Sequence, residues 1–133
     1  MKVLIDTCIW SQVLRHKKTN IELSEQLKDL IKDGRVVMIG PIRQELLSGI
    51  SEPSQFKQLK EKLSSFDDLP LLSEYFVKAA EFSNICRKKG IQGSTTDFLI
   101  CAVSSIQKLQ IFTEDNDFLD YKKHLSIHLY KSV

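Results

Sequence analysis

Short apolar runs alternate along this chain with longer stretches in which apolar residues recur at helical spacing. The unbroken runs are typical of parallel strands that are covered on both faces, and the longer stretches are typical of amphipathic helices. The runs predict five strands, at residues 3–5, 36–39, 69–72, 110–113 and 127–130. Their alternation with helices predicts an α/β fold, a three-layer α/β/α sandwich around a five-stranded, mainly parallel sheet.

Capping residues and glycines mark the ends of the predicted helices. Asn20 is suited to begin a helix that Gly34 ends, and Ser73 is suited to cap a later one. A loop of cap-type residues, 93–96, leads into a nearly all-apolar helix that we expect to lie deep in the core. The predicted helix starts, in chain order, are residues 7, 20, 41, 53, 73, 97 and 118.

Four acidic residues fall where a predicted strand ends or a helix begins. Asp6 directly follows the first strand and Asp115 follows the fourth, whereas Asp97 begins the most apolar helix and Glu45 lies one turn inside the helix after the second strand. Because the carboxyl ends of parallel strands line one edge of a sheet, distant acids can converge there. Each acid alone has an ordinary explanation as a cap, a turn residue or part of a solvated face. Together their placement favours a site.

Such a site would need a cation to neutralise it. Two carboxylates about 5 Å apart repel by roughly 3 kcal/mol at an effective dielectric constant of about 20. An all-oxygen ligand set without thiolate or imidazole suits Mg²⁺ or Mn²⁺ better than Zn²⁺, and the implied chemistry is hydrolysis of a phosphodiester by a metal-activated water. Thr7, Ser94 and Thr113 could hydrogen-bond the ligands and orient them.

Length and composition add few constraints. The chain has 133 residues, the size of one domain, and we expect a single domain over residues 1–133. No apolar run approaches the roughly 20 residues of a membrane helix, and Asp6 comes too early for a signal peptide. Cys8, Cys86 and Cys101 lack the paired spacings of zinc sites and are expected to be reduced core thiols. We therefore expect a cytoplasmic protein without a membrane segment.

The formal net charge of +2 hides an asymmetry. Setting aside the four candidate site acids leaves 13 of the 17 acidic residues against 19 basic ones. Basic clusters at residues 15–18, 87–89 and 122–124 could form a rim around an acidic pocket, which would suit a polyanionic substrate. Lysines at helix ends are common for electrostatic reasons alone, so each cluster by itself is weak support.

The four acids lie in recognisable sequence motifs. These are V-L-I-D-T at 3–7, P-I-R-Q-E-L at 41–46, S-T-T-D-F-L-I-C-A at 94–102 and I-F-T-E-D-N-D-F at 111–118. In this order and spacing, the chain resembles the PIN-domain ribonucleases over essentially its whole length. It is most similar to the VapC-like toxins of type II toxin–antitoxin pairs.

The resemblance carries several implications. It implies that Asp6, Glu45, Asp97 and Asp115 form the catalytic, metal-binding quartet, with Asp117 ranked below them as a further ligand. It also implies a sheet order of 3-2-1-4-5, a Mg²⁺ or Mn²⁺ cofactor, a homodimer, and a VapB-like antitoxin whose C-terminal segment lies over the pocket. The implied activity is an endoribonuclease acting on RNA such as tRNA or rRNA.

Other classes of protein also collect acids at strand ends. A haloacid-dehalogenase-type phosphatase would need a second Asp where this chain has Cys8, and a receiver domain would need an Asp closing the third strand, where Ser73 and Glu74 follow instead. Both alternatives are disfavoured. A housekeeping PIN nuclease, or a PIN-like module that only binds RNA or protein, stays open, because a ligand set is necessary for cleavage but does not prove it.

Overall fold

The computed structural model describes residues 1–15 and 20–131. Within these residues, two helices lie between the first and second strands, four between the second and third, and one between the third and fourth. In chain order the elements are β1 (Val3–Ile5), α1 (Thr7–Arg15), α2 (Ile21–Lys32), β2 (Val36–Val37), α3 (Gly40–Leu47), α4 (Pro53–Leu63), α5 (Ser73–Lys88), α6 (Thr95–Gln107), β3 (Gln110–Phe112), α7 (Asp117–Lys122) and β4 (His128–Leu129).

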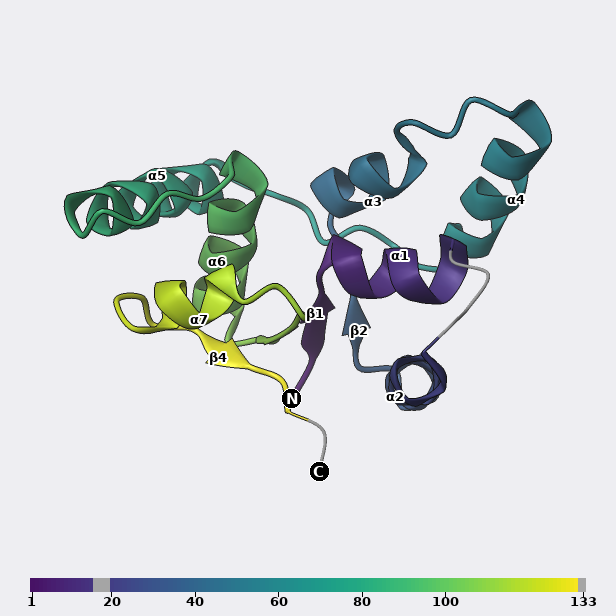
Figure 1. The fold of residues 1–133 in the computed structure, drawn as a ribbon, viewed down its shortest axis with the longest axis horizontal. Coiled ribbons are helices and arrows are strands. Elements are labelled where there is room, and N and C mark those ends of the chain that lie inside the picture. The colour runs from purple at the N-terminus through teal and green to yellow at the C-terminus, as the bar shows by residue number, and fades with distance from the viewer. Residues whose placement is uncertain (16–19, 132–133) are drawn as a thin grey trace.

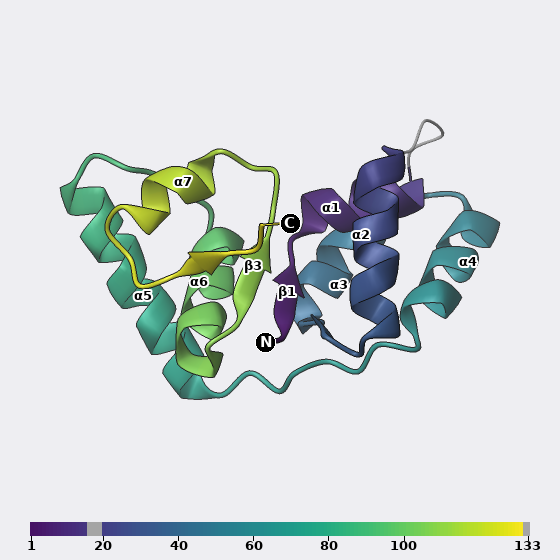
Figure 2. The same cartoon turned by 90° about the horizontal axis from the view of Figure 1, so that it is seen from below.

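The strands form one parallel sheet in the order β2-β1-β3-β4. Strand β1 is central, and its Val3 lies opposite both Val36 of β2 and Gln110 of β3. Helices α1 to α4 lie on one side of the strands, and α5, α6 and α7 lie on the other (Figures 1 and 2). The α/β fold class predicted from the sequence is confirmed.

The number of strands was predicted wrongly, because the described residues form four strands and not five. At the predicted third strand, only a single parallel bridge joins Met38 to Asp68, next to a hydrogen bond from the Leu69 amide to the Met38 carbonyl at 2.8 Å. Pro70 follows at once and has no amide hydrogen to continue the ladder. The bridge lies beside β2, at the edge where the order 3-2-1-4-5 places the missing strand.

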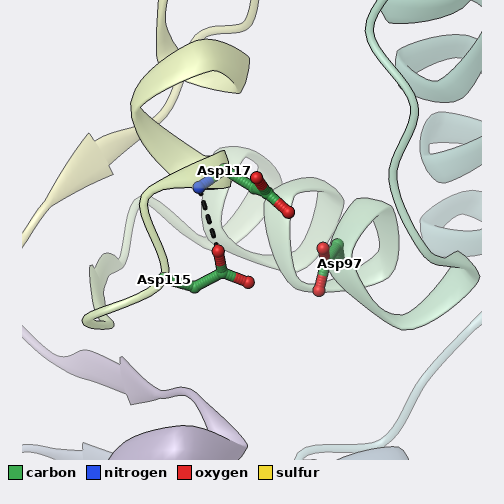
Figure 3. A group of neighbouring side chains, drawn as sticks. All are labelled: Asp97, Asp115 and Asp117. Atoms are coloured by element: carbon green, nitrogen blue, oxygen red, sulfur yellow. Dashed lines mark hydrogen bonds between the residues drawn. The ribbon is translucent and has the colours of Figure 1, made fainter.

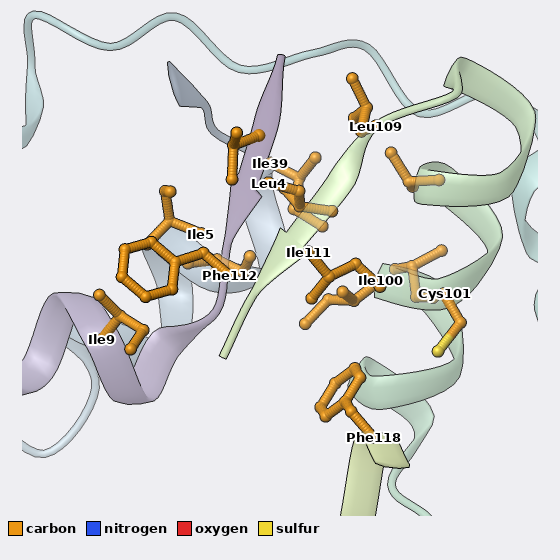
Figure 4. Close-up of a cluster of buried hydrophobic side chains, with 14 of the residues drawn as sticks. Leu4, Ile5, Ile9, Ile39, Ile100, Cys101, Leu109, Ile111, Phe112 and Phe118 are labelled. Atoms are coloured by element: carbon orange, nitrogen blue, oxygen red, sulfur yellow. The ribbon is translucent and has the colours of Figure 1, made fainter. Parts of the chain in front are cut away.

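The core is continuous from the sheet into the surrounding helices (Figure 4). Ile9 of α1 and Phe112 of β3 lie on one side of the central strands, and Ile111 and Ile100 lie on the other. The buried residues of α6 are seven consecutive ones, Phe98 to Ser104. A helix that is buried all round is held firmly by its neighbours. This confirms the prediction of a deep helix behind the third acidic motif.

Most predicted helix ends are found where the capping residues stand. Asn20 accepts hydrogen bonds from two backbone amides at the start of α2, and Ser94 accepts one from the Asp97 amide at 3.0 Å. Gly34 follows α2 in the left-handed region that favours glycine. Ser73 does not act as a cap. It is the first residue of α5, and Leu72 precedes it without a side-chain cap.

Three aromatic residues of α1 and α5 differ in their exposure. Trp10 is buried and packs edge to face on Phe66, with ring centroids 5.1 Å apart. Tyr75 is also buried, whereas Phe76 is 52% exposed on α5.

Two of the three predicted basic clusters can be placed. Residues 87–89 at the end of α5 and 122–124 at the end of α7 are exposed. Within the cluster at 15–18, residues 16–18 and the Arg15 side chain lie outside the described residues. None of the described helices is both long and apolar enough to cross a bilayer.

Candidate metal centre

The carboxyl ends of β1 and β3 meet at one edge of the sheet. Ile5 of β1 lies opposite Phe112 of β3, so the residues that follow them, Asp6 and Thr113, come side by side. The Asp6 amide donates to the Phe112 carbonyl at 2.9 Å and continues the ladder past the end of the strand. Parallel pairing therefore places the first and last acidic motifs next to each other, as predicted for this edge.

Three acids approach each other closely at this edge (Figure 3). Asp97 lies in the first turn of α6, Asp115 in the loop after β3, and Asp117 at the start of α7. One carboxylate oxygen of each lies within 4.8 Å of those of the other two. The Asp117 amide donates to Asp115 Oδ1 at 2.9 Å, which holds the loop in a tight turn. The acid ranked lowest from the sequence, Asp117, is thus one of the three in closest approach.

Asp6 is outside this close group but is connected to it. Asp6 is only 7% exposed, and both of its carboxylate oxygens accept hydrogen bonds. Oδ1 accepts from the Thr7 amide and Oδ2 from the Thr113 hydroxyl, each at 2.8 Å. The same Thr113 oxygen accepts from the Asp115 amide at 3.0 Å. Thr113 therefore links the buried acid of β1 to the loop that carries Asp115.

Glu45 reaches the site from α3 and remains exposed. Partial burial raises the pKa of its carboxyl, the Thr96 hydroxyl opposes this by hydrogen bonding, and the charges of Asp6 and Asp97 raise the pKa further. The pKa of Glu45 therefore depends in part on the charges of two other candidate acids. It is not among the three acids in closest approach.

The surroundings of Asp97 disfavour its ionised form. Burial raises the pKa of its carboxyl, and the charges of Asp6 and Asp115 raise it further. Hydrogen bonds from Tyr121 and Ser94 act in the opposite direction. A carboxylate that burial and like charges both disfavour is stabilised by a nearby cation.

The donor set fits a divalent metal ion with a preference for oxygen ligands. Among the described side chains, those of residues 1–14 and 20–131, the ion pairs are Arg43–Asp68, Lys78–Glu81 and Lys123–Asp120, so none of the site acids has a basic partner there. Two full charges 4.8 Å apart repel by about 3 kcal/mol at an effective dielectric constant of about 20. A cation among Asp97, Asp115 and Asp117 would remove this repulsion, and carboxylate oxygens suit Mg²⁺ or Mn²⁺.

The hydroxyl residues expected to support the ligands differ from one another. Thr113 bonds a site acid directly through its side chain. Ser94 acts one step away, as the cap of the helix that carries Asp97. Thr7 donates to Asp6 through its backbone amide, and its own hydroxyl is buried without a hydrogen-bond partner.

Two residues at the site were not singled out from the sequence. Cys8 was expected in the core, but it is half-buried and its Sγ lies 3.5 Å from Asp6 Oδ2 and 3.6 Å from Thr113 Oγ1. Burial raises the pKa of this thiol, which keeps it protonated. Tyr121 donates its hydroxyl to Asp97 Oδ2 at 2.8 Å. Its position four residues after Asp117 on a short helix gave no sequence signal for this contact.

Solved structures similar to this chain share its fold at low sequence identity. FitAcB from Neisseria gonorrhoeae has a TM-score of 0.79 at 20% identity, over 97% of this chain and 96% of that one. VapBC2 from Rickettsia felis, bound to a DNA fragment from their promoter, has a TM-score of 0.81 at 15% identity, and both chains are covered completely. VapBC from Salmonella typhimurium, also bound to DNA, has a TM-score of 0.74 at 15% identity, over 98% and 97% of the two chains.

Sequence comparison assigns the family. No curated protein matches this chain in sequence. The family model of the PIN domain matches residues 3–124, from β1 to just beyond α7, and so includes all the acids described above. The match spans most of the chain, and the protein therefore belongs to the PIN-domain family of nucleases.

Proposed function

We propose that this protein is a metal-dependent endoribonuclease and the toxin of a toxin–antitoxin pair. The observation that carries the proposal is the convergence of Asp97, Asp115 and Asp117 at the edge where Asp6 ends β1, in a chain of the PIN-domain family. Solved structures with similar folds include VapBC and other toxin–antitoxin complexes, which supports the second half of the proposal.

Each acid has a distinct part in this proposal. Asp97, Asp115 and Asp117 would hold the cation, and Asp6 and Glu45 would border it. A bound Mg²⁺ or Mn²⁺ would lower the pKa of a coordinated water and neutralise charge that develops on the phosphodiester. Asp6 is oriented by Thr113 and the Thr7 amide before any ligand arrives, so little reorganisation is needed there.

Exposed basic residues support an RNA substrate. Residues 87–89 and 122–124 are exposed at the C-terminal ends of α5 and α7, the two helices on the side of the sheet that also carries α6. Phosphate neutralisation supplies much of the affinity for nucleic acids. Single-stranded or looped RNA is the expected form of substrate, because proteins read RNA through exposed bases and shape.

An apolar groove supports an antitoxin partner. It has a volume of about 290 Å³ between α1, α2 and α4, and Lys28 and Lys62 border it. Apolar residues on its walls include Val13, Leu14, Leu27, Ile31, Leu63 and Phe66. An apolar antitoxin segment with acidic neighbours would complement it. Ile31→Glu should weaken binding of the co-expressed antitoxin and leave RNA cleavage by the isolated protein unchanged.

A second apolar surface supports the homodimer. Leu72 and Phe76, one turn apart at the start of α5, are both more than half exposed, and Phe76 borders a groove together with Ala79, Ala80 and Leu99. A second copy of the chain is the occupant we propose for this surface, in line with the resemblance to VapC-like toxins. Light scattering should give the mass of a dimer for the wild type and of a monomer for Phe76→Glu.

Cleavage by the purified protein tests the enzymatic half of the proposal. Single-stranded RNA should be cut in the presence of Mg²⁺ or Mn²⁺ and left intact with EDTA. Asp97→Ala and Asp6→Ala should each reduce the rate by at least about a hundredfold, because both remove charge from the site. Asp29→Ala is the matched control, since it removes an exposed acid from α2. Unchanged rates in both site variants, with circular dichroism showing folded protein, would refute the assignment.

Growth of an expressing culture tests the toxin half. Induction should arrest growth, co-expression of the adjacent antitoxin should restore it, and Asp97→Ala should be harmless. Sequencing of RNA 5′ ends after induction would name the substrate. An active nuclease that is harmless to the cell would instead indicate a housekeeping PIN protein.

A further inference from the structure

Tyr121 is a fully buried residue of α7 whose hydroxyl reaches the candidate metal centre. The hydroxyl donates to Asp97 Oδ2 at 2.8 Å, across 24 positions of sequence. Burial and the charge of Asp97 raise the pKa of this phenol, so it stays a donor at neutral pH. The bond occupies one side of the Asp97 carboxylate and restricts rotation of its plane.

The ring of Tyr121 is held by two other aromatic residues. Its centroid is 5.1 Å from that of Phe98 and 5.1 Å from that of Phe118, the second at an interplanar angle of 72°. Phe98 follows Asp97 directly, and Phe118 follows Asp117 directly. The aromatic cluster therefore connects the backbone segments that carry two of the three closely spaced acids.

Gly93 provides the space for the Tyr121 hydroxyl. A Cβ atom added at Gly93 would overlap the hydroxyl oxygen and would approach two ring atoms of Phe98 to 2.9 Å. The backbone of Gly93 is not in the left-handed region, in contrast to Gly34, Gly49 and Gly90. Space, not conformation, is therefore what requires glycine at this position.

We propose that Tyr121 is a positioning residue that orients the Asp97 carboxylate toward the cation, and that Gly93 is the glycine that allows it to do so. The inference rests on the proposed metal-dependent function and extends it to two residues outside the acidic set. A hydrogen-bonding partner that fixes a ligand's orientation commonly changes metal affinity by about 10-fold to 100-fold.

Tyr75 provides a matched comparison within the same protein. It is also a buried tyrosine with a hydrogen-bonded hydroxyl, but its partner is the neutral Gln107 side chain at the far end of α6. Tyr75→Phe and Tyr121→Phe each remove one buried hydroxyl. Only Tyr121→Phe removes a contact with a site acid.

Titration with Mn²⁺ alone, followed by electron paramagnetic resonance, tests the proposal without relying on cleavage. Tyr121→Phe should weaken Mn²⁺ binding about tenfold, and cleavage should recover at saturating Mn²⁺. Tyr75→Phe should change the affinity by less than about twofold, because distant sites act independently. Thermal unfolding of both variants identifies any general loss of structure.

Gly93→Ala supplies a second, independent route to the same contact. It should weaken Mn²⁺ binding about tenfold in the wild type but less than about threefold in Tyr121→Phe, since the hydroxyl it displaces is already gone. Equal Mn²⁺ affinity of folded Tyr121→Phe and wild type would overturn this inference alone. Failure of the wild type to bind Mn²⁺ would overturn the proposed function as well.

Discussion

The two halves of the candidate site stabilise negative charge in different ways. Asp6, at the end of β1, is buried, and both of its oxygens accept hydrogen bonds from Thr7 and Thr113. Asp97, Asp115 and Asp117, at the ends of α6 and α7, approach one another without a basic partner among the described residues. Hydrogen bonds within the protein thus stabilise the Asp6 carboxylate, whereas the charges of the other three acids would need a cation to neutralise them.

This contrast explains which acids tolerate the absence of metal. A carboxylate with two donors is well placed in the metal-free protein, and its loss leaves those donors unpaired. Carboxylates that repel each other destabilise the metal-free fold and become favourable when a divalent ion binds. In the function proposed here, the site would therefore combine a preorganised acid with a group of acids that would respond to metal.

The largest expected difference is in the stability of the metal-free protein. Asp6→Ala should lower the free energy of unfolding by about 2 kcal/mol, because two part-buried donors, the Thr7 amide and the Thr113 hydroxyl, lose their acceptor. Asp97→Asn should raise it by about 1 kcal/mol, because it removes a buried charge whose pKa is raised. Urea unfolding in EDTA measures both values. A loss of stability in both variants would contradict the proposed difference between Asp6 and Asp97.

The next largest effect is expected at Thr113, because its hydroxyl is hydrogen-bonded both to Asp6 and to the Asp115 amide. Thr113→Val removes the donor to Asp6 Oδ2 and the acceptor for the Asp115 amide while it preserves shape. We expect cleavage at a fixed, sub-saturating Mn²⁺ concentration to fall about tenfold. Ser48→Ala, which removes an exposed hydroxyl at the end of α3, is the control. A cleavage rate of Thr113→Val within about twofold of the wild-type rate would show that cleavage does not need the Thr113 hydrogen bonds.

The pH dependence should have opposite signs with and without metal. Asp97 and Glu45 have raised pKa values in the folded protein, so between the unfolded and folded pKa values the native state binds more protons. Their contribution to stability is therefore favourable at low pH and is lost as pH rises above about 4 through the raised values. With Mn²⁺, which binds the ionised form, stability should instead rise with pH.

Thermal unfolding between acid and neutral pH, in EDTA and in Mn²⁺, measures this dependence. The variant carrying both Asp97→Asn and Glu45→Gln isolates these two groups from all others that titrate in the same range. It should show a flatter profile under both conditions. An unchanged profile would assign the pH dependence to other residues.

The smallest expected effect concerns the second hydroxyl of the site. The hydroxyl of Thr7 is buried without a hydrogen-bond partner, in contrast to that of Thr113. Thr7 donates a hydrogen bond to Asp6 through its backbone amide. Thr7→Val keeps the shape and the amide, so stability should stay unchanged or rise by up to about 1 kcal/mol. Cleavage should be close to that of the wild type. A large loss of activity would mean that the hydroxyl bonds the substrate.

Much of the fold follows from local patterns in the sequence. Val3–Ile5 and residues 111–112 are apolar because strands covered on both faces exclude polar side chains, and the structure places strands there. The run at 69–72 is apolar as well, yet Pro70 limits its pairing to a single bridge. This run is not buried either, since Leu72 is 59% exposed, so an apolar run alone establishes neither a strand nor burial.

The sequence by itself determined which acids are candidates, because positions after strands and at helix starts are readable along the chain. Asp6, Glu45, Asp97 and Asp115 were named in this way, and Asp117 was added through the resemblance to PIN-domain ribonucleases. What only the tertiary structure decided is how they divide, with three in close approach and Asp6 held apart by its own hydrogen bonds. That division depends on how α7 packs against α6, a contact between distant segments.

Tyr121 and Gly93 show more clearly that the local sequence does not predict contacts between α6 and α7. Along the chain, one is an aromatic residue in a short helix and the other a glycine in a loop. Their relation to Asp97 exists only because aromatic packing between α6 and α7 directs one hydroxyl into the space left by one missing side chain. Local sequence sets which groups are present, and non-local packing sets the distances of a few ångströms on which a metal centre depends.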